Sequence, residues 1–543
     1  MENDDTAMAS FASGDYTGEP TGHLVYIGFI PGSIIALLYR MASSLPWYTL
    51  TLFALDILAL SAISCVVWNQ RRVLGVPHLL ASSTVLFFWA MRLFLCPTFT
   101  MTAMCLGTAG VLVLTLSRPG SPFRSRLAII LGTGSIAAAA AVRWDSMVGI
   151  LVMTLPFAAY QLRSFRWHQN LKMAGLTLVL LAVVAGANKL GERSPGWSDY
   201  RQLNEVRGAL HGTLQLARVT LPENKAIVAP TLAANHWTIH DVTLFGGWLF
   251  EDPDVYSAKK VKRLLDLSRK TRFQTKWPEA WHIVVNGRNA LLGALVISAI
   301  MSLWRARRVA ALVTVQVGWA AAVALYVART QRFPDRIAIP LALTLCLTVL
   351  LSDTDFRRSS APVPRPRNIS FRALRGIALW ASFGLFLAFA AIPLWRLYGP
   401  TALSRDNANL VRRLNQQLRI LRNTDPMGKF ILVGSSMDLL GVDALAVPGP
   451  YATMDILPTS WQNQSPNQQQ RIRKLGLSRN ILLSVLNDPH RYLAIKTNLV
   501  APITAVYSTR FGETVELEMI AKLSSYSAIY RVATVPKRQS QNP

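Results

Sequence analysis

Long apolar blocks separated by short polar loops fill the middle of the chain. Each block has roughly the 20 residues that an α-helix needs to cross the hydrocarbon core of a bilayer. The pattern predicts about ten membrane-spanning helices. We place them at residues 47–68, 77–96, 98–116, 127–142, 146–162, 171–188, 287–304, 309–328, 336–352 and 374–396. The predicted fold class is therefore a polytopic α-helical membrane protein.

Every second loop between these blocks is short and rich in arginine or lysine. Loops of this kind stay on the cytoplasmic side of a membrane. The remaining loops then face outward, and both long polar regions fall among them, so the protein should be a multi-pass protein of the cell membrane. The basic loops are residues 69–76, 117–126, 163–172, 305–308 and 353–373.

The polar regions divide the chain into three parts. Residues 1–46 form an extracytoplasmic acidic loop, in which Leu24–Met41 is apolar but interrupted by Pro31, so we expect a re-entrant or interfacial helix there. Residues 47–396 form the transmembrane domain, with a large outer loop at 189–286. No signal sequence precedes the outward-facing N-terminal segment, and we expect an upstream transmembrane helix to be missing from this sequence.

Residues 397–543 form an extracytoplasmic C-terminal domain. Asn407–Asn423 has the periodicity of an amphipathic helix, and short apolar runs at 430–433 and 528–533 predict strands, which together indicate a small α/β domain. Gly434-Ser435-Ser436 follows the first of these strands, but the sequence around it lacks the second glycine of a nucleophile elbow.

Composition supports the membrane assignment. Only 16% of the 543 residues are charged, and 51% are hydrophobic, whereas a soluble protein has about a quarter charged residues. The formal net charge is +27, but the arginines lie in the short loops that set topology, so we do not expect nucleic acid as a partner. The four cysteines lie in or beside apolar blocks and have no disulfide or metal-site spacing.

Carboxylates are concentrated near the N-terminus. Asp4 and Asp5 are adjacent, and Asp15, Glu19 and His23 follow in a glycine-rich stretch. Adjacent carboxylates repel one another, so the pair makes sense if one acts as a base or if both share a cation. The alternative is a solvated acidic tail.

Two outer turns add charged residues at helix ends. Arg143 and Asp145 flank a tryptophan and indicate either a functional site or an interfacial ion pair. Residues 329–336 contain Arg332 and Arg336, which contradict the positive-inside rule unless they have another purpose. Binding of a lipid phosphate is one such purpose, because guanidinium groups pair with phosphate oxygens. A simple exception to the rule is the alternative.

The large outer loop combines aromatic and polar residues. Asn235 to Asp241 includes two histidines, but their spacing matches no known metal motif, whereas tryptophans beside carboxylates suit a sugar site. Residues 259–265 are basic and amphipathic, so we expect them to lie on the membrane surface. Asp56 and Arg92 lie inside predicted spans and are the only sequence hint of a polar path through the bilayer.

Part of this pattern resembles a known family. Asn3-Asp4-Asp5, the run Ser13-Gly14-x-Tyr16-Thr17-Gly18-x-Pro20-x-x-His23, and Trp47-Tyr48 look like the first outer loop of bacterial GT-C fold glycosyltransferases. The resemblance covers residues 1–396. It implies an enzyme that moves a sugar from a polyprenyl-phosphate donor to an extracytoplasmic acceptor such as a cell-envelope glycan, by an inverting general-base mechanism.

The resemblance also implies roles for individual residues. Asp4 or Asp5 would be the general base, and Asp145 and Asp241 would assist it or orient the acceptor. Arg143, Arg332 and Arg336 would bind the lipid phosphate, and the further candidates for substrate binding are Asp15, Glu19, His23 and Asn235. The sequence requires no cofactor and leaves a divalent cation open. A transporter or flippase of lipid-linked glycans and a non-catalytic membrane scaffold remain the alternatives.

Overall fold

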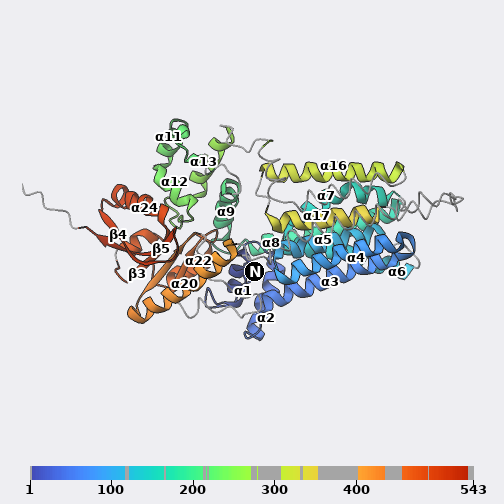
Figure 1. The fold of residues 1–543 in the computed structure, drawn as a ribbon, viewed down its shortest axis with the longest axis horizontal. Helices are drawn as coiled ribbons and strands as arrows, with labels where there is room; N and C mark the ends of the chain where they lie inside the picture. Colours follow the sequence, from blue (N-terminus) through green and yellow to red (C-terminus); the bar gives the residue numbers. More distant parts are fainter. Residues whose placement is uncertain are drawn as a thin grey trace, which may run out of the picture.

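The computed structural model describes residues 3–116, 122–163, 167–211, 216, 219–270, 278, 307–330, 334–352, 402–434, 455–486 and 488–535. A bundle of long helices forms one end of the molecule, and the polar regions gather at the other (Figure 1). The fold class predicted from the sequence is confirmed: a polytopic helical membrane protein carries a small C-terminal α/β domain.

The predicted spans that fall on described residues all form helices. Six helices are long and apolar enough to cross a membrane, and three more apolar helices are shorter, as judged over the described residues. The predicted spans 287–304 and 374–396 lie outside the described residues. The bundle helices are α3 (Trp47–Asn69), α4 (Arg71–Leu95), α5 (Phe99–Leu116), α6 (Pro122–Val142), α7 (Trp144–Leu162), α8 (Trp167–Gly191), α16 (Arg307–Thr330) and α17 (Asp335–Leu351).

Helix α5 is the centre of the bundle. It is 94% buried inside the protein, and it packs against α3, α6, α7 and α17. Two glycines bring α5 and α6 close together: a Cβ atom on Gly110 would lie 2.8 Å from the carbonyl oxygen of Gly132. Lipid offers no hydrophobic drive for helices to associate, so close backbone contact of this kind is a main source of their attraction.

The acidic N-terminal segment is a buried helix, which corrects the expectation of a loop. Helix α1 (Asn3–Ser13) has its two aspartates in the first turn, where carboxylates interact favourably with the helix dipole. Met8 and Phe11 are completely buried, because α1 packs between α2 (Phe29–Met41), α3 and the C-terminal domain. The solvated-tail alternative is therefore wrong.

The described residues of the predicted outer loop form a helical unit. Its elements are α9 (Trp197–His211), η1 (Pro222–Asn224), α11 (Lys225–Asn235), α12 (Ile239–Gly246) and α13 (Ala258–Lys270). The expectation that residues 259–265 lie on the membrane is wrong: Val261, Leu264 and Leu265 are buried against α9 and α11. The apolar face of α13 found a protein partner instead of lipid.

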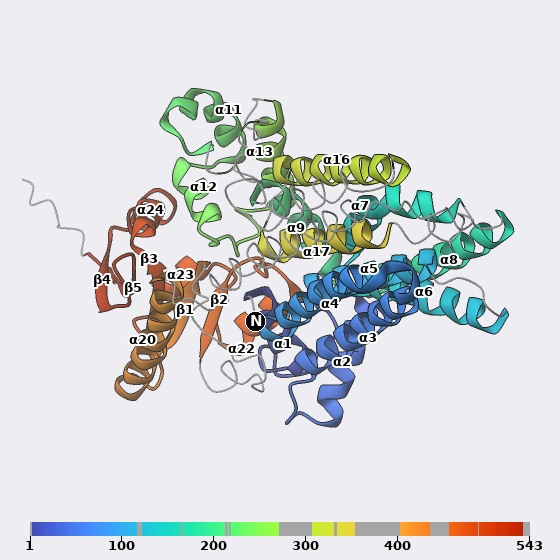
Figure 2. The same ribbon diagram turned by 45° about the vertical axis from the view of Figure 1, so that its right-hand side comes forward.

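A five-stranded sheet in the order β2-β1-β3-β5-β4 forms the core of the C-terminal domain. Strand β1 pairs in parallel with β2 and β3, whereas β5 pairs antiparallel with β3 and β4. Both ribbon views place this sheet beyond the end of the bundle (Figures 1 and 2). The domain comprises α20 (Ala402–Thr424), β1 (Lys429–Val433), β2 (Ile456–Thr459), α22 (Pro466–Lys474), α23 (Ile481–Leu486), β3 (Arg491–Lys496), η3 (Thr497–Leu499), α24 (Val500–Val506), η4 (Tyr507–Phe511), β4 (Val515–Lys522) and β5 (Ser527–Thr534).

Candidate functional site

The C-terminal domain contacts the N-terminal segment at the end of the bundle. The Tyr16 hydroxyl donates a hydrogen bond to Gln468 Oε1 on α22, and Asn467 Nδ2 donates to the backbone oxygen of His23 at 3.2 Å. The ring of Trp461, which follows β2, lies 5.9 Å from that of Phe11. Parts of the chain more than 440 residues apart therefore share one buried interface.

Asp5 anchors α1 to the bundle. Its side chain is completely buried, and its Oδ1 atom accepts hydrogen bonds from the Tyr48 hydroxyl at 2.8 Å and from the Phe99 backbone N–H at 3.0 Å. These donors come from the first turns of α3 and α5. Asp5 thus fixes the helix that carries Asp4 against two transmembrane helices.

Asp4 points to a different partner. Its Oδ2 atom accepts a hydrogen bond from Arg336 Nη1 at 3.0 Å, and the exposed fractions of the two side chains are 17% and 24%. Arg336 lies in the first turn of α17. The acidic segment and the basic outer turn, which the sequence presented as separate candidates, form one ion pair that solvent can still reach.

Two further arginines contact Tyr26, and the negative charge of Asp4 lies near enough to act on the Tyr26 hydroxyl. The Arg143 guanidinium lies 5.7 Å from the centre of the Tyr26 ring, and its Nη1 atom donates to Thr100 Oγ1 at 2.8 Å. Arg207 Nη2 donates to the Tyr26 hydroxyl at 3.4 Å. Burial raises the pKa of that hydroxyl, with Arg207 opposing the shift, so Tyr26 stays a neutral hydrogen-bonding group at pH 7.

We call Asp4, Tyr26, Arg143, Arg207 and Arg336 the Asp4 cluster. Arg336 pairs with Asp4, Arg143 lies within electrostatic reach of Asp4, Asp145 and Arg336, and Arg207 contacts Tyr26. Guanidinium groups gathered in this way can bind an anion, and a phosphate group suits the planar donors of arginine.

Arg207 and Tyr26 were not among the predicted site residues. On α9, Arg207 follows Tyr200 and Leu203 at helical spacing, and all three side chains are buried. A buried arginine on the apolar face of an outer helix was therefore a usable signal, because burying such a charge is costly without a partner. Tyr26 offered no comparable signal.

The other predicted residues near the N-terminus have varied surroundings. Asp145 is exposed beside Arg143, and Glu19 is exposed. Asp15 is buried, with its own N–H donating to Ser13 Oγ at 3.3 Å. His23 stacks on the Trp197 ring at 4.8 Å, and burial lowers the pKa of its imidazole. Arg332 lies outside the described residues.

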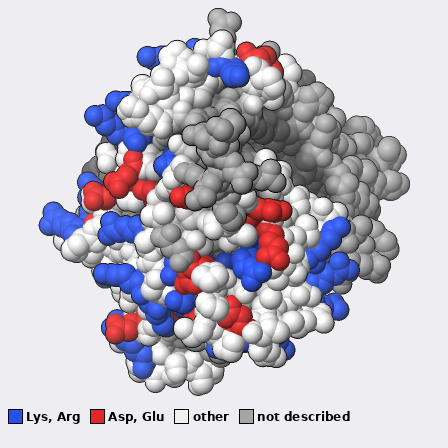
Figure 3. All heavy atoms as spheres, turned by 90° about the vertical axis from the view of Figure 1, so that its left-hand side faces the viewer, with Lys and Arg blue, Asp and Glu red and all other residues white. Residues whose placement is uncertain are grey.

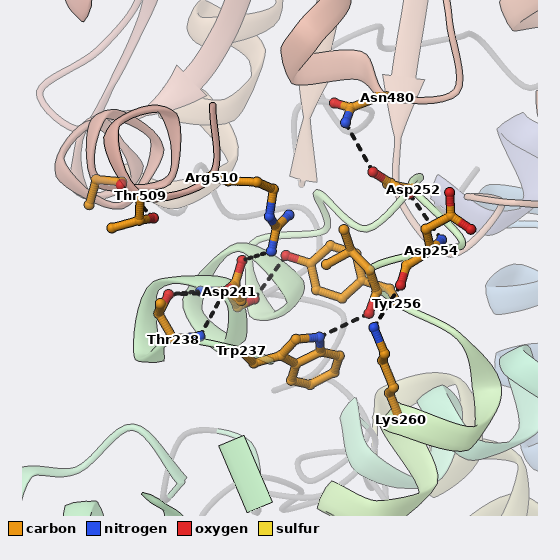
Figure 4. A network of polar contacts seen from close by, with 12 residues as sticks. Trp237, Thr238, Asp241, Asp252, Asp254, Tyr256, Lys260, Asn480, Thr509 and Arg510 are labelled. Carbon is orange, nitrogen blue, oxygen red and sulfur yellow. Dashed lines mark hydrogen bonds and ion pairs between the residues drawn. The ribbon is translucent and has the colours of Figure 1, made fainter. Parts of the chain in front are cut away.

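Asp241 and Asn235 make contacts within the outer loop and to the C-terminal domain. Asp241 closes a capping box with Thr238 at the start of α12, and its Oδ1 atom lies 2.6 Å from Arg510 Nη2 (Figure 4). Asn235 Nδ2 donates to the Lys260 carbonyl at 3.0 Å. Asp241 thus links α12 to the C-terminal domain, and Asn235 links α11 to α13.

Arg510→Ala should destabilise the interface between α12 and η4. Asp241 is only 3% exposed, so loss of the guanidinium leaves a buried carboxylate without its ion-pair partner. We expect a loss of roughly 2–4 kcal/mol, seen as a lower unfolding temperature of the purified protein. Asp241→Asn in the Arg510→Ala background should recover part of it, and an unchanged unfolding temperature in the single variant would contradict this role.

Glu251 is a buried acid on the same interface. Both of its carboxylate oxygens accept from the Gln464 backbone N–H, at 3.0 and 2.9 Å, and its side chain is 4% exposed. Burial raises the pKa of the Glu251 carboxyl well above its usual value of 4.5, and the Gln464 N–H opposes this shift only in part. The folded protein therefore holds a proton on Glu251 more tightly than the unfolded chain does.

That raised pKa predicts a direction for the pH dependence of stability. Below pH 4.5 the Glu251 carboxyl is protonated in both the folded and the unfolded protein, and folding has no cost from burying a charge. As the pH rises above 4.5 the unfolded chain releases this proton first, so the free energy of unfolding falls until the pH reaches the folded-state pKa. Glu251→Gln should remove this loss and raise the unfolding temperature at neutral pH relative to the wild type. If the variant and the wild type had equal unfolding temperatures from about pH 4 to pH 8, this role of Glu251 would be refuted.

Among the described residues, no three His, Cys, Asp or Glu side chains are grouped so that they could hold a metal ion. The Asp4 cluster itself consists of three arginines, a tyrosine and a carboxylate.

Comparison with known proteins gives a distant likeness. No protein-family model matches the chain, and no curated protein matches it. The chain is similar to two solved structures of ArnT from Cupriavidus metallidurans, one in the apo state and one bound to undecaprenyl phosphate. The identities are 14% and 13%, each likeness covers 97% of this chain and 92% of the other, and the TM-score is 0.38.

Proposed function

We propose that this protein is a membrane glycosyltransferase of the GT-C type, which moves a sugar from a polyprenyl-phosphate donor to an acceptor outside the cytoplasm. One observation carries the proposal: a partly exposed carboxylate, Asp4, lies 3.0 Å from Arg336 at the end of a transmembrane bundle, and Arg143 and Arg207 contact the neighbouring Tyr26. This arrangement combines a candidate base with an anion-binding surface at one end of helices that are long enough to span a membrane.

The chemistry divides between the two kinds of group. Asp4 takes the proton from an acceptor hydroxyl, and the oxygen attacks the anomeric carbon of the sugar. The bond from that carbon to the phosphate oxygen breaks, and the polyprenyl phosphate leaves with the electron pair. Arg143, Arg207 and Arg336 offset the negative charge that grows on the phosphate. Attack from the face opposite the phosphate inverts the anomeric configuration.

Asp4 is the better candidate for the base because of what surrounds each carboxylate. Asp5 is completely buried, and Oδ1 is already hydrogen-bonded to Tyr48 and Phe99. Asp4 keeps access to solvent and therefore to an acceptor. We assign Asp5 the task of positioning α1, and the remaining predicted residues Asp145, Asp15, Glu19 and His23 stay proposals for acceptor contacts.

The test is a transfer assay with the protein in lipid nanodiscs, a panel of polyprenyl-phosphate sugars and an envelope glycan fraction as acceptor. We expect the wild type to move sugar from at least one donor and Arg336→Ala to lose most of this transfer. Arg201→Ala removes an exposed arginine of α9 outside the Asp4 cluster and serves as the control. Equal transfer by Arg336→Ala and wild type, or no transfer from any donor, would overturn the proposal.

The transporter alternative makes a different demand on the bundle. Asp56 on α3 is fully buried and Arg92 on α4 is 6% exposed, so polar groups do lie within the helices. A flippase would carry a lipid-linked glycan across vesicle membranes without cleaving it. Reconstituted vesicles that move the intact lipid, and release no sugar, would favour that alternative.

A further inference from the structure

Helix α20 presents a basic face that the Asp4 cluster does not use. Leu414 and Leu418 are 0% and 2% exposed, and they pack the helix against the protein. The opposite face, at helical spacing, carries Arg412, Gln416 and Arg419. Two residues seven apart lie on one side of a helix, about 10.5 Å apart along its axis.

Among the described residues, no acidic side chain forms an ion pair with the exposed arginines of this helix. Arg412, Arg413, Arg419 and Arg422 are all exposed, and none of them makes a hydrogen bond or ion pair with another described side chain. Exposed surface helices usually intersperse acids with bases at positions three and four apart, which stabilises the helix. The nearest acids in the sequence are Asp406 and Asp425, and Asp425 is hydrogen-bonded to His490 and Tyr492. No acid lies between them, so the positive charge of residues 407–424 remains available to an anion from outside.

Two features suit this face to a glycan rather than to lipid. The amides of Gln416 and Asn423 lie in line with Arg412 and Arg419, so cations alternate with groups that can both donate to and accept from sugar hydroxyls. Figures 1 and 2 also place α20 beside the sheet of the C-terminal domain, beyond the end of the transmembrane bundle. A membrane surface at the level where the bundle helices end would not contact the exposed face of α20 along its whole length.

The wider surface agrees with this reading. Figure 3 looks onto the end of the molecule that carries the C-terminal domain, and lysine and arginine side chains appear there in several groups, with fewer aspartates and glutamates between them. An anionic strand approaching this end would meet an attractive field before it made any contact.

We infer that the exposed face of α20 binds an extended anionic glycan, whose carboxylate or phosphate groups pair with Arg412 and Arg419 while its hydroxyls contact Gln416. In the proposed transfer reaction this face would hold the acceptor, and in that respect the inference rests on the proposed function. The pairing itself needs neither donor nor catalysis, because guanidinium groups bind such oxyanions directly.

Binding of fluorescent polyuronate oligomers to the full chain in zwitterionic nanodiscs tests this inference. We expect salt-sensitive binding by the wild type, binding that is about tenfold weaker in the double variant Arg412→Gln/Arg419→Gln, and none to dextran oligomers of equal length. The matched control Lys259→Gln/Lys262→Gln removes the same charge from exposed positions on α13 and should bind like the wild type.

Three results would overturn the inference. The first is equal binding by the α20 double variant and the wild type, and the second is an equal loss of binding in the α13 control. The third is displacement of the oligomer by phosphatidylglycerol vesicles at matched charge, because that result would assign the face to lipid. Asp4→Asn should bind the oligomer like the wild type. Binding at α20 can therefore be tested in a variant without transferase activity, and failure of one proposal does not imply failure of the other.

Discussion

Asp4→Asn should reduce sugar transfer by about 10²–10⁴-fold, with little change in KM for the donor. The amide keeps the shape of the side chain and can still accept from Arg336, but it cannot take the proton of the acceptor hydroxyl. The effect should therefore appear in kcat. Purified variant and wild type are compared in the nanodisc assay under saturating donor and acceptor.

The control for Asp4→Asn is Asp199→Asn, which removes an exposed carboxylate from the first turn of α9. This variant should retain full activity. The unfolding temperature of Asp4→Asn should match the wild type, since a partly exposed ion pair contributes only about 0–1 kcal/mol. Full activity in Asp4→Asn would exclude it as the base and return that role to another carboxylate.

Asp5→Ala should have a different signature, with loss of stability as the primary effect. Removing the carboxylate leaves the Tyr48 hydroxyl and the Phe99 N–H buried without their acceptor. Each unsatisfied donor costs about 1–3 kcal/mol, so the total for the two donors should be roughly 2–6 kcal/mol. The measurement is the unfolding temperature in detergent, together with the rate at which a protease cuts within residues 1–46.

Asp5→Asn separates anchoring from chemistry. Its side-chain oxygen can still accept from both donors, so stability and activity should recover in large part. If Asp5→Asn instead remained as stable as the wild type but lost 10²-fold or more in kcat, about the effect expected for a general base, Asp5 rather than Asp4 would be the base. The pair of variants at each position thus assigns the two carboxylates independently.

Local pattern predicted the membrane helices, the amphipathic helix α20 and two strands of the C-terminal sheet. The apolar blocks marked α3 to α8, α16 and α17, because a bilayer requires a continuous apolar stretch of about 20 residues whatever the tertiary contacts are. The amphipathic period of residues 407–423 likewise predicted α20, and short apolar runs predicted β1 and β5. These features need only neighbouring residues to be specified.

Tertiary structure decided what each polar residue does. Sequence placed Asp4 and Asp5 together, but only packing shows that one is buried under Tyr48 while the other faces Arg336, 332 residues away. The same holds for Asp241, which the sequence presented as a site residue and the fold pairs with Arg510. Charge and burial at such positions depend on segments distant in the chain, and no local period encodes them.

The apolar face of α13 makes the same point for hydrophobic side chains. Sequence could show that residues 259–265 have an apolar face to bury, but not whether lipid or protein would cover it, because both remove it equally from water. The structure supplied the answer through Val261 and Leu264, which pack within the outer loop. The sequence alone thus determined which faces and charges needed partners, and the fold selected those partners from distant parts of the chain.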